Sequence, residues 1–186
     1  MKIGVISDTH GNIIAYEKAL QFIGDADLIV HAGDVLYHPP RLGFTDGYDI
    51  PALADALNLL AVPIVIAQGN CDAQVYEELL EMPVQSPYAY VSCGDTRILV
   101  NHGHMLSRNQ MIDIAHRYKA DYFVSGHTHV PVIERVGSIV LMNPGSPSIP
   151  KFEIDGIPVP TVGLITENGA WVINIEDGSV IIELHS

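Results

Sequence analysis

The sequence predicts an α/β (α+β) protein that forms a four-layer α/β/β/α sandwich, and three observations lead to this fold class. In the first two thirds of the chain, short apolar runs alternate with helical stretches, which is typical of a mostly parallel inner sheet. In the last third, apolar runs follow one another with only turn signals between them, which is typical of antiparallel hairpins. The length of 186 residues fits one compact domain, residues 1–186, in which the two sheets pack on each other.

The first two thirds of the chain supply five expected strands and three expected helices. The strands are short apolar runs at residues 3–6, 28–30, 64–66, 97–100 and 122–124. The helices are expected at residues 12–22, 50–60 and 109–118. The first of them shows an amphipathic pattern, because Ile13 and Leu20 are apolar whereas Glu17 and Lys18 are polar.

The last third of the chain is expected to consist of strands without intervening helices. Apolar runs predict strands at residues 132–134, 139–142, 162–165, 171–175 and 180–184. Turn signals separate them at Val136-Gly137, Asn168-Gly169 and Asp177-Gly178. These strands are therefore assigned to a second, antiparallel sheet that packs on the first.

The composition excludes several classes of partner. The chain has 22 acidic and 9 basic residues, which gives a formal charge of −13 and disfavours binding to nucleic acid. It does not exclude an anionic substrate, because bound divalent cations would reverse the sign of the field locally. The cysteines Cys71 and Cys93 are expected to be reduced thiols. No secretory signal or long apolar run is visible, so we expect a cytoplasmic protein that does not bind membranes.

Polar residues follow five of the expected strands at the point where each strand ends. These tracts are Ser7-Asp8-Thr9-His10-Gly11, His31-Ala32-Gly33-Asp34, Gln68-Gly69-Asn70-Cys71-Asp72, Asn101-His102-Gly103-His104 and Ser125-Gly126-His127-Thr128-His129. Ligands of such folds gather outside the carboxyl ends of the strands. A lone Gly-Asp or Gly-Asn pair usually marks a turn. Five such tracts, in order and each at a strand end, indicate a metal site.

The types of side chain indicate which metals the site would take. Asp8 with His10, and His127 with His129, are two residues apart, so both members of each pair can turn toward one point in an extended loop. Carboxylate, amide and imidazole ligands together suit Mn²⁺, Fe or Zn²⁺ better than a thiolate site would.

The same tracts resemble the signature of the calcineurin-like metallophosphoesterases. Residues 33–38, 69–72 and 143–150 are similar to one subgroup, the small bacterial YfcE-type phosphodiesterases. The resemblance implies two divalent metal ions per chain, most often Mn²⁺, with Fe, Zn or Ni as alternatives. It implies that one metal is held by Asp8, His10, Asp34 and His129. It implies that the other is held by Asp34, Asn70, His102 and His127, with Asp34 as the bridge.

The expected activity is hydrolysis of a small phosphodiester, including aryl diesters such as bis-p-nitrophenyl phosphate, by a metal-bridging hydroxide. Two cations about 3.5–4 Å apart stabilise both the attacking and the leaving oxygen. The candidate catalytic residues are Asp34, Asn70, Cys71 and His104. Many relatives carry a histidine, proposed to protonate the leaving oxygen, at the position of Cys71. His104 and His38 are the candidates to replace it.

Several roles stay open at the level of sequence. His104 either touches the phosphate or orients the His102 loop, and Tyr37, His38 and Arg41 line the substrate cleft or belong to a solvated loop. His31 is expected to be a buried histidine with its hydrogen bonds satisfied. Asp72 either bonds to a neighbour of the site or caps a helix. The chain is alternatively a scaffold on the same fold, as in the retromer subunit, and a homo-oligomer is left open.

Overall fold

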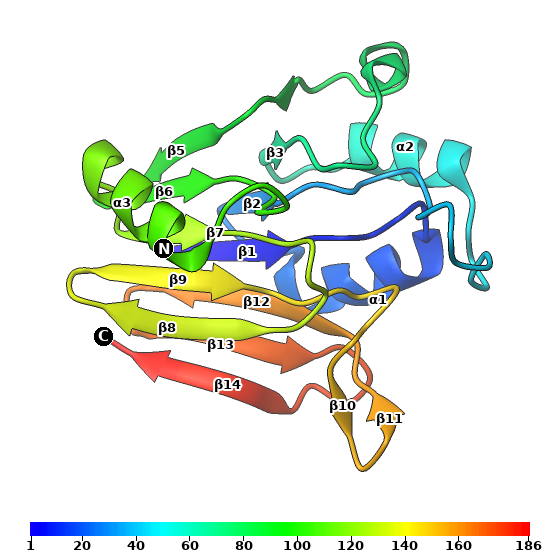
Figure 1. Ribbon diagram of the computed structural model, residues 1–186. Helices are drawn as coiled ribbons and strands as arrows, with labels where there is room; N and C mark the ends of the chain where they lie inside the picture. The colour runs from blue at the N-terminus through cyan, green and yellow to red at the C-terminus, as the bar shows by residue number, and fades with distance from the viewer.

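The computed structural model describes residues 1–186, apart from the side chain of Glu77. Two mixed β-sheets lie face to face, and helices cover the outer face of each, as Figure 1 shows. The predicted four-layer α/β/β/α arrangement is therefore confirmed. Among the described residues, no helix is both long and apolar enough to cross a bilayer.

The first sheet has seven strands in the order β14-β13-β12-β1-β2-β3-β4. Its parallel half consists of β1 (Lys2–Ile6), β2 (Leu28–His31), β3 (Ile64–Ala67) and β4 (Val84–Gln85). Its antiparallel half consists of β12 (Thr161–Thr166), β13 (Gly169–Asn174) and β14 (Val180–His185). The helices α1 (Ile13–Ile23) and α2 (Ile50–Asn58) pack on its outer face.

The second sheet has five strands in the order β5-β6-β7-β9-β8. Its strands are β5 (Ala89–Cys93), β6 (Thr96–Val100), β7 (Tyr122–Val124), β8 (Val132–Val136) and β9 (Ile139–Asn143). The helix α3 (Arg108–Tyr118) packs on its outer face. Outside the two sheets lie a short 3₁₀ helix η1 (Gln74–Glu78) and a small hairpin of β10 (Glu153–Ile154) and β11 (Ile157–Pro158).

The expected division of strands between the sheets is wrong. The last third of the chain does not form a sheet of its own: β8 and β9 join β6 and β7, whereas β12, β13 and β14 extend the first sheet beyond β1. The reason lies in β12, which is buried on both faces. Val162 packs with the helices α1 and α2, and Ile165 packs between the two sheets. A strand that is apolar on both faces needs a place inside a sheet, and β12 finds it beside β1.

Alternation along the central strands builds the layers. Val5 of β1 points into the core between the sheets, and its neighbour Ile6 points toward the helices. In the second sheet, Val124 of β7 faces the core between the sheets while Phe123 packs beneath α3. Because successive side chains of a strand point to opposite faces, the polar residues that follow each strand are left at its open end.

Two helix starts fix the loops that carry the polar tracts. Asn12 caps α1 by accepting the Ala15 N–H at 2.9 Å, and it comes directly after the Asp8–Gly11 tract. Ser107 caps α3 in a reciprocal arrangement with Gln110, three residues after His104. Capping of this kind satisfies N–H groups at the helix start and so determines where each loop ends.

Candidate metal centre

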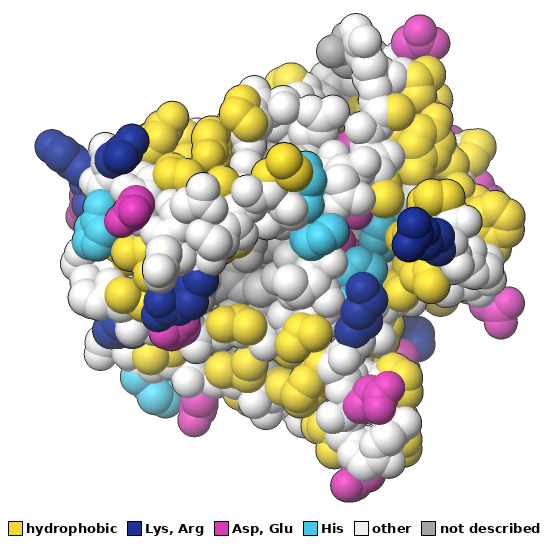
Figure 2. Space-filling model, in the orientation of Figure 1, with side chains coloured by type: hydrophobic (Ala, Val, Ile, Leu, Met, Phe, Trp, Pro, Cys, Tyr) yellow, Lys and Arg dark blue, Asp and Glu magenta, His cyan; other side chains and the backbone are white. Residues whose placement is uncertain are grey.

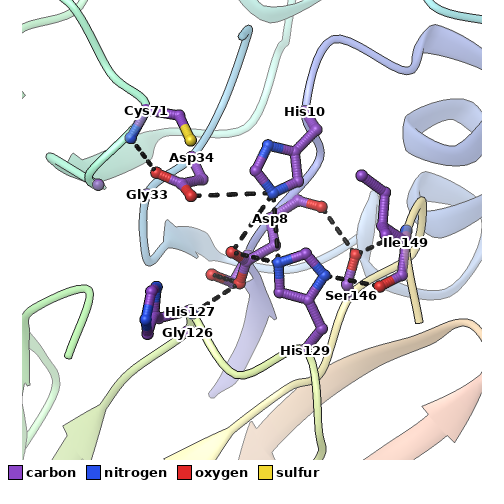
Figure 3. Close-up of polar contacts among 12 residues, drawn as sticks. Asp8, His10, Gly33, Asp34, Cys71, Gly126, His127, His129, Ser146 and Ile149 are labelled. Carbon is purple, nitrogen blue, oxygen red and sulfur yellow. Dashed lines mark hydrogen bonds and ion pairs between the residues drawn. The ribbon is translucent and has the colours of Figure 1, made fainter. Parts of the chain in front are cut away.

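The polar tracts predicted from the sequence converge at one edge of the sandwich. Asp8 and His10 follow β1, Asp34 follows β2, His102 follows β6 and His129 follows β7. The strands β1 and β2 are parallel, as are β6 and β7, so the carboxyl ends of each pair lie at the same edge of their sheet. Figure 3 shows side chains from both sheets turned toward one another at this edge.

Five nitrogen and oxygen atoms form the centre of the site. The Nε2 atom of His129 lies 3.2 Å from Asp8 Oδ1, and the Nε2 atom of His102 lies 3.3 Å from Asp34 Oδ2. His10 stands between the two pairs, since its Nε2 is 3.7 Å from Asp8 Oδ1 and 3.8 Å from Asp34 Oδ2 (Figure 3). These atoms fall into groups of donors that could each hold a metal ion.

Each of the three histidines is held in one tautomer by the backbone. The Nδ1–H group donates to a carbonyl in every case: His10 to Tyr37 at 2.8 Å, His102 to Ala32 at 2.8 Å, and His129 to Ile149 at 2.6 Å. A carbonyl can only accept, so Nδ1 carries a proton in each ring and Nε2 is the nitrogen that faces the centre. This is the usual arrangement of metal-binding histidines in proteins.

The two carboxylates are oriented in the same manner. Asp8 Oδ2 accepts the Ser7 hydroxyl at 2.6 Å and the His127 N–H at 3.0 Å, and Asp34 Oδ1 accepts the Cys71 N–H at 2.7 Å. The second oxygen of each is left for the centre. Within the described residues, Asp8 Oδ1 and His102 Nε2 are buried without a hydrogen-bond partner. Buried polar atoms rarely lack a partner, so these two orphaned lone pairs fit bound cations.

The charge of the centre is negative without metal. Burial works to raise the pKa of Asp8 and of Asp34, but the neighbouring imidazoles His129 and His102 outweigh it and lower both pKa values. Burial likewise works to lower the pKa of His102, yet the Asp34 and Asp8 carboxylates outweigh it and raise that pKa. Burial lowers the pKa of His10. Metal binding requires ionised carboxylates, which the lowered pKa values favour, and it would displace the proton that the carboxylates favour on His102.

The backbone of the site is strained at the predicted ligands. Five of the seven non-glycine residues with positive φ are predicted metal ligands, namely Asp8 (56°), His10 (45°), Asp34 (57°), His127 (67°) and His129 (58°). Such conformations cost of order 1–3 kcal/mol each and persist where the surrounding structure enforces them. Their concentration here marks the edge of the sandwich as a functional site.

The glycines of the tracts permit the close packing of the two carboxylates. A Cβ atom on Gly69 would lie 2.2 Å from Asp34 Oδ1, and one on Gly126 would lie 1.9 Å from Ser7 Oγ and 2.6 Å from Asp8 Oδ2. No larger residue fits at either position without displacing a ligand.

The predicted ligands differ in how closely the fold gathers them. Asp8, His10, Asp34, His102 and His129 are all buried and lie together. Asn70 and His127 are exposed at the rim: the His127 ring is 5.3 Å from that of His102, and Asn70 Nδ2 is 3.3 Å from Cys71 Sγ. The half-buried Cys71 groups with His10 and Asp34 as a third set of donor atoms.

Asp72 and Tyr76 hold the loop that carries Asp34. The Asp72 carboxylate accepts three backbone N–H groups, from Asp34 at 2.9 Å, Val35 at 2.8 Å and Gly69 at 2.7 Å. The Tyr76 hydroxyl accepts the N–H groups of residues 36 and 37, at 3.1 and 2.7 Å. Asp72 is therefore a hydrogen-bonding support of the site, because the 3₁₀ helix that follows has no side-chain cap.

A second support was only partly visible in the sequence. The hydroxyls of Ser146 and Ser148 both donate to the Asp8 carbonyl at 2.8 Å. These serines belong to the tract 143–150, for which the sequence left contact with the cleft or a simple turn open. The segment also supplies the Ile149 carbonyl that orients His129. A serine-proline tract does not by itself indicate these two hydrogen bonds to the Asp8 carbonyl.

The remaining histidines near the site take different positions. His31 is fully buried between Thr9 and Gly33 with both ring nitrogens hydrogen-bonded, which confirms its expected structural role. His104 is exposed, 5.6 Å from the His102 ring, and lines a cavity of about 420 Å³ together with Asn70.

The three residues singled out in the loop after Asp34 lie in different environments. The Tyr37 ring packs against Tyr76 with a centroid separation of 5.2 Å, so it belongs to the support of the site. His38 is buried 6.4 Å from the His10 ring, between it and Phe44, and Arg41 is exposed.

Comparison with known proteins identifies the family. Residues 1–166 match the model of the calcineurin-like phosphoesterase superfamily domain. The chain is 35% identical to phosphodiesterase YfcE of Escherichia coli K12, over 99% of this chain and 97% of that protein. It is 31% identical to a probable metallophosphoesterase of Methanocaldococcus jannaschii, over 84% of this chain and 73% of that protein.

Solved structures agree with this assignment. The E. coli phosphoesterase YfcE superposes with a TM-score of 0.85 at 32% identity, covering 100% of this chain and 99% of that one. Vacuolar Protein Sorting 29 of Cryptosporidium parvum has a TM-score of 0.70 at 17% identity, over 100% and 98% of the two chains, which shows a shared fold alone. The resemblance inferred from the strand-end tracts is confirmed, and the chain belongs to the calcineurin-like phosphoesterase superfamily.

Proposed function

We propose that the chain is a binuclear metal-dependent phosphodiesterase. The observation that carries the proposal is the buried cluster in which the Nε2 atoms of three histidines and two carboxylate oxygens face one another. The name of the E. coli relative, phosphodiesterase YfcE, supports the choice of diester over monoester.

The residues divide into two proposed ligand sets. Asp8, His10, Asp34 and His129 would hold one metal, and Asp34, Asn70, His102 and His127 would hold the other. Asp34 is the proposed bridge because its Oδ2 faces both His10 and His102. When bound, the metals would lower the pKa of water and neutralise the charge of the phosphate. Mn²⁺ is the proposed ion, in keeping with the mixture of oxygen and nitrogen donors.

The protein's own groups perform the orienting work. The backbone carbonyls of Ala32, Tyr37 and Ile149 fix the histidines, and Asp72 fixes the Asp34 loop. The exposed His104, which lines the same cavity as Asn70, would contact the phosphate or the leaving oxygen.

A scaffold on the same fold is a weaker candidate. A protein that only binds a partner has no need of strained φ angles at five ligand positions or of three imidazoles locked in one tautomer.

The proposal is tested by metal content and by turnover in the same preparation. Protein stripped of metal and reloaded with Mn²⁺ should approach two equivalents by elemental analysis, and should hydrolyse bis-p-nitrophenyl phosphate faster than p-nitrophenyl phosphate. Full activity at one equivalent would contradict the two-metal arrangement. A faster monoester reaction would contradict the diester preference.

A further inference from the structure

An apolar cavity of about 310 Å³ adjoins the metal centre and is used by no part of the proposed chemistry. The apolar residues that line it include Leu106, Met111, Val132 and Leu141. Figure 2 shows histidine side chains gathered on one face of the molecule and a hollow beside them on the same face. A volume of this size is at the small end of ligand pockets and suits a substituent rather than a whole molecule.

The cavity is continuous with the loops that carry the proposed ligands. Gly103, Gly126 and Thr128 line it, and they are direct neighbours in sequence of His102, His127 and His129. The cavity therefore borders the loops that carry three of the proposed ligands.

The charged side chains of the cavity and its Asn143 amide are already paired. Asn143 Nδ2 donates to the Gly126 carbonyl at 2.7 Å and to Thr128 Oγ1 at 3.1 Å. The Arg108 guanidinium forms a two-pronged ion pair with Glu134, one contact being 2.9 Å from Nε to Oε2. No charge is left over to attract an anionic or strongly polar group, so the cavity favours an apolar occupant.

One wall of the cavity is exposed to solvent. Val132 begins β8 with 41% of its surface exposed, whereas Leu141 and Met142 on the neighbouring strand are 7% and 1% exposed. An occupant beside Val132 would remove apolar surface from water at a place where the fold leaves it uncovered.

We propose that this cavity binds the non-leaving ester group of the diester, and that the group it favours is an aliphatic chain. This inference rests on the proposed function and deepens it, because a phosphodiester carries a second organic group that must lie beside the metals while the first one leaves. The walls favour an aliphatic chain over a planar ring because they are built from branched and thioether side chains that pack around a flexible chain.

The test is a series of 4-nitrophenyl alkyl phosphates in which the leaving group is constant and the alkyl chain is methyl, propyl or pentyl. With Mn²⁺-loaded wild type, kcat/KM should rise with chain length, by up to about fourfold for each methylene that is buried. Val132→Trp narrows the cavity and should abolish the rise, so that the ratio of kcat/KM for the pentyl ester to that for the methyl ester falls toward one. Leu106→Ala removes a wall and should lower the ratio of pentyl to methyl ester.

The matched control is Leu59→Trp, which adds the same ring at a residue that is 83% exposed at the end of α2, and it should keep the rise. A flat chain-length series in wild type, or an unchanged series in Val132→Trp, would overturn the proposal. Failure of the wild-type protein to turn over the methyl ester would instead count against the proposed phosphodiesterase activity. Equilibrium binding of pentylphosphonate and methylphosphonate, measured in parallel, tests the cavity independently of turnover: equal affinities would overturn it.

Discussion

His31 makes the protein sensitive to acid in a way that can be measured. Its Nδ1 accepts the Gly33 N–H at 3.1 Å, and its Nε2–H donates to Thr9 Oγ1 at 3.0 Å, whose hydroxyl in turn donates to the Val35 carbonyl at 2.8 Å. A proton added to Nδ1 would face the Gly33 N–H. This arrangement accepts only the neutral ring, and complete burial accordingly lowers the pKa of His31 to about 3.

The sign of the effect follows from the two pKa values. The unfolded chain binds the proton near pH 6.5, whereas the folded chain does not bind it until about pH 3. The contribution of His31 to the free energy of unfolding is therefore fully present above pH 6.5 and is lost as the pH falls from about 6.5 to about 3. The loss from this one group is about 1.4 kcal/mol for each pH unit below 6.5. At pH 5 it amounts to about 2 kcal/mol, a sizeable part of the stability of an ordinary domain.

The assay compares wild type with His31→Gln, whose amide can accept from Gly33 and donate to Thr9 without titrating. Urea unfolding of metal-free protein at pH 7.5, 6 and 5 gives the free energy of unfolding of both. Other titrating groups are common to the two proteins, so their difference isolates His31. At pH 7.5 the variant should have a lower free energy of unfolding than wild type. At pH 5 this difference between the two proteins should be about 2 kcal/mol smaller. Parallel curves for the two proteins would refute the assignment of a neutral, buried His31.

Three substitutions test the centre and its supports. Asp34→Asn removes an anionic oxygen from between the proposed cations, so activity should fall at least about 100-fold. The control His116→Ala, on the exposed side of α3, should leave activity near that of wild type. Equal activities of the two variants would show that the site is misplaced. Asp72→Ala leaves three buried N–H groups without an acceptor and should cost at least about 3 kcal/mol in urea unfolding; a loss below about 1 kcal/mol would contradict its support role. Burial, then Asp34, raises the pKa of Cys71 to about 12, so the thiol is a weak proton donor. In a series of phenyl-substituted diesters, Cys71→His should flatten the dependence of rate on leaving-group pKa, and equal slopes would mean that proton donation does not pass through this position.

The ligand tracts could be predicted because their chemistry is local. A polar residue directly after a buried strand must lie at the end of that strand, so Asp8, Asp34 and His102 were placed by strand prediction alone. His31 could be distinguished from the predicted ligands because it is the last residue of an apolar strand. The predicted helices were also correct to within one or two residues at most ends, since caps such as Asn12 and Ser107 are short-range signals.

The parts that could not be predicted depend on contacts between distant segments. Nothing in the pattern of β12 names β1 as its partner, and the sheet it joined follows from burial on both faces. The carbonyls that orient the histidines, such as Ala32 for His102, leave no trace in the sequence because every residue has one. The same holds for the hydrogen bond from Ser146 to the Asp8 carbonyl.

The net charge of the protein predicts that the proposed metals are needed for binding the proposed substrate as well as for the reaction. A chain with a formal charge of −13 presents the Asp8 and Asp34 carboxylates at the bottom of its site, and their field already raises the pKa of His102. A phosphodiester anion brought to this place without cations meets like charge in a partly buried setting, where repulsion is poorly screened. Two divalent ions would bring four positive charges against two carboxylates and reverse the local sign. Equilibrium binding of methylphosphonate should therefore be lost in metal-free protein and return on addition of Mn²⁺, and binding of equal strength in both states would show that the anion is held by the protein's own groups.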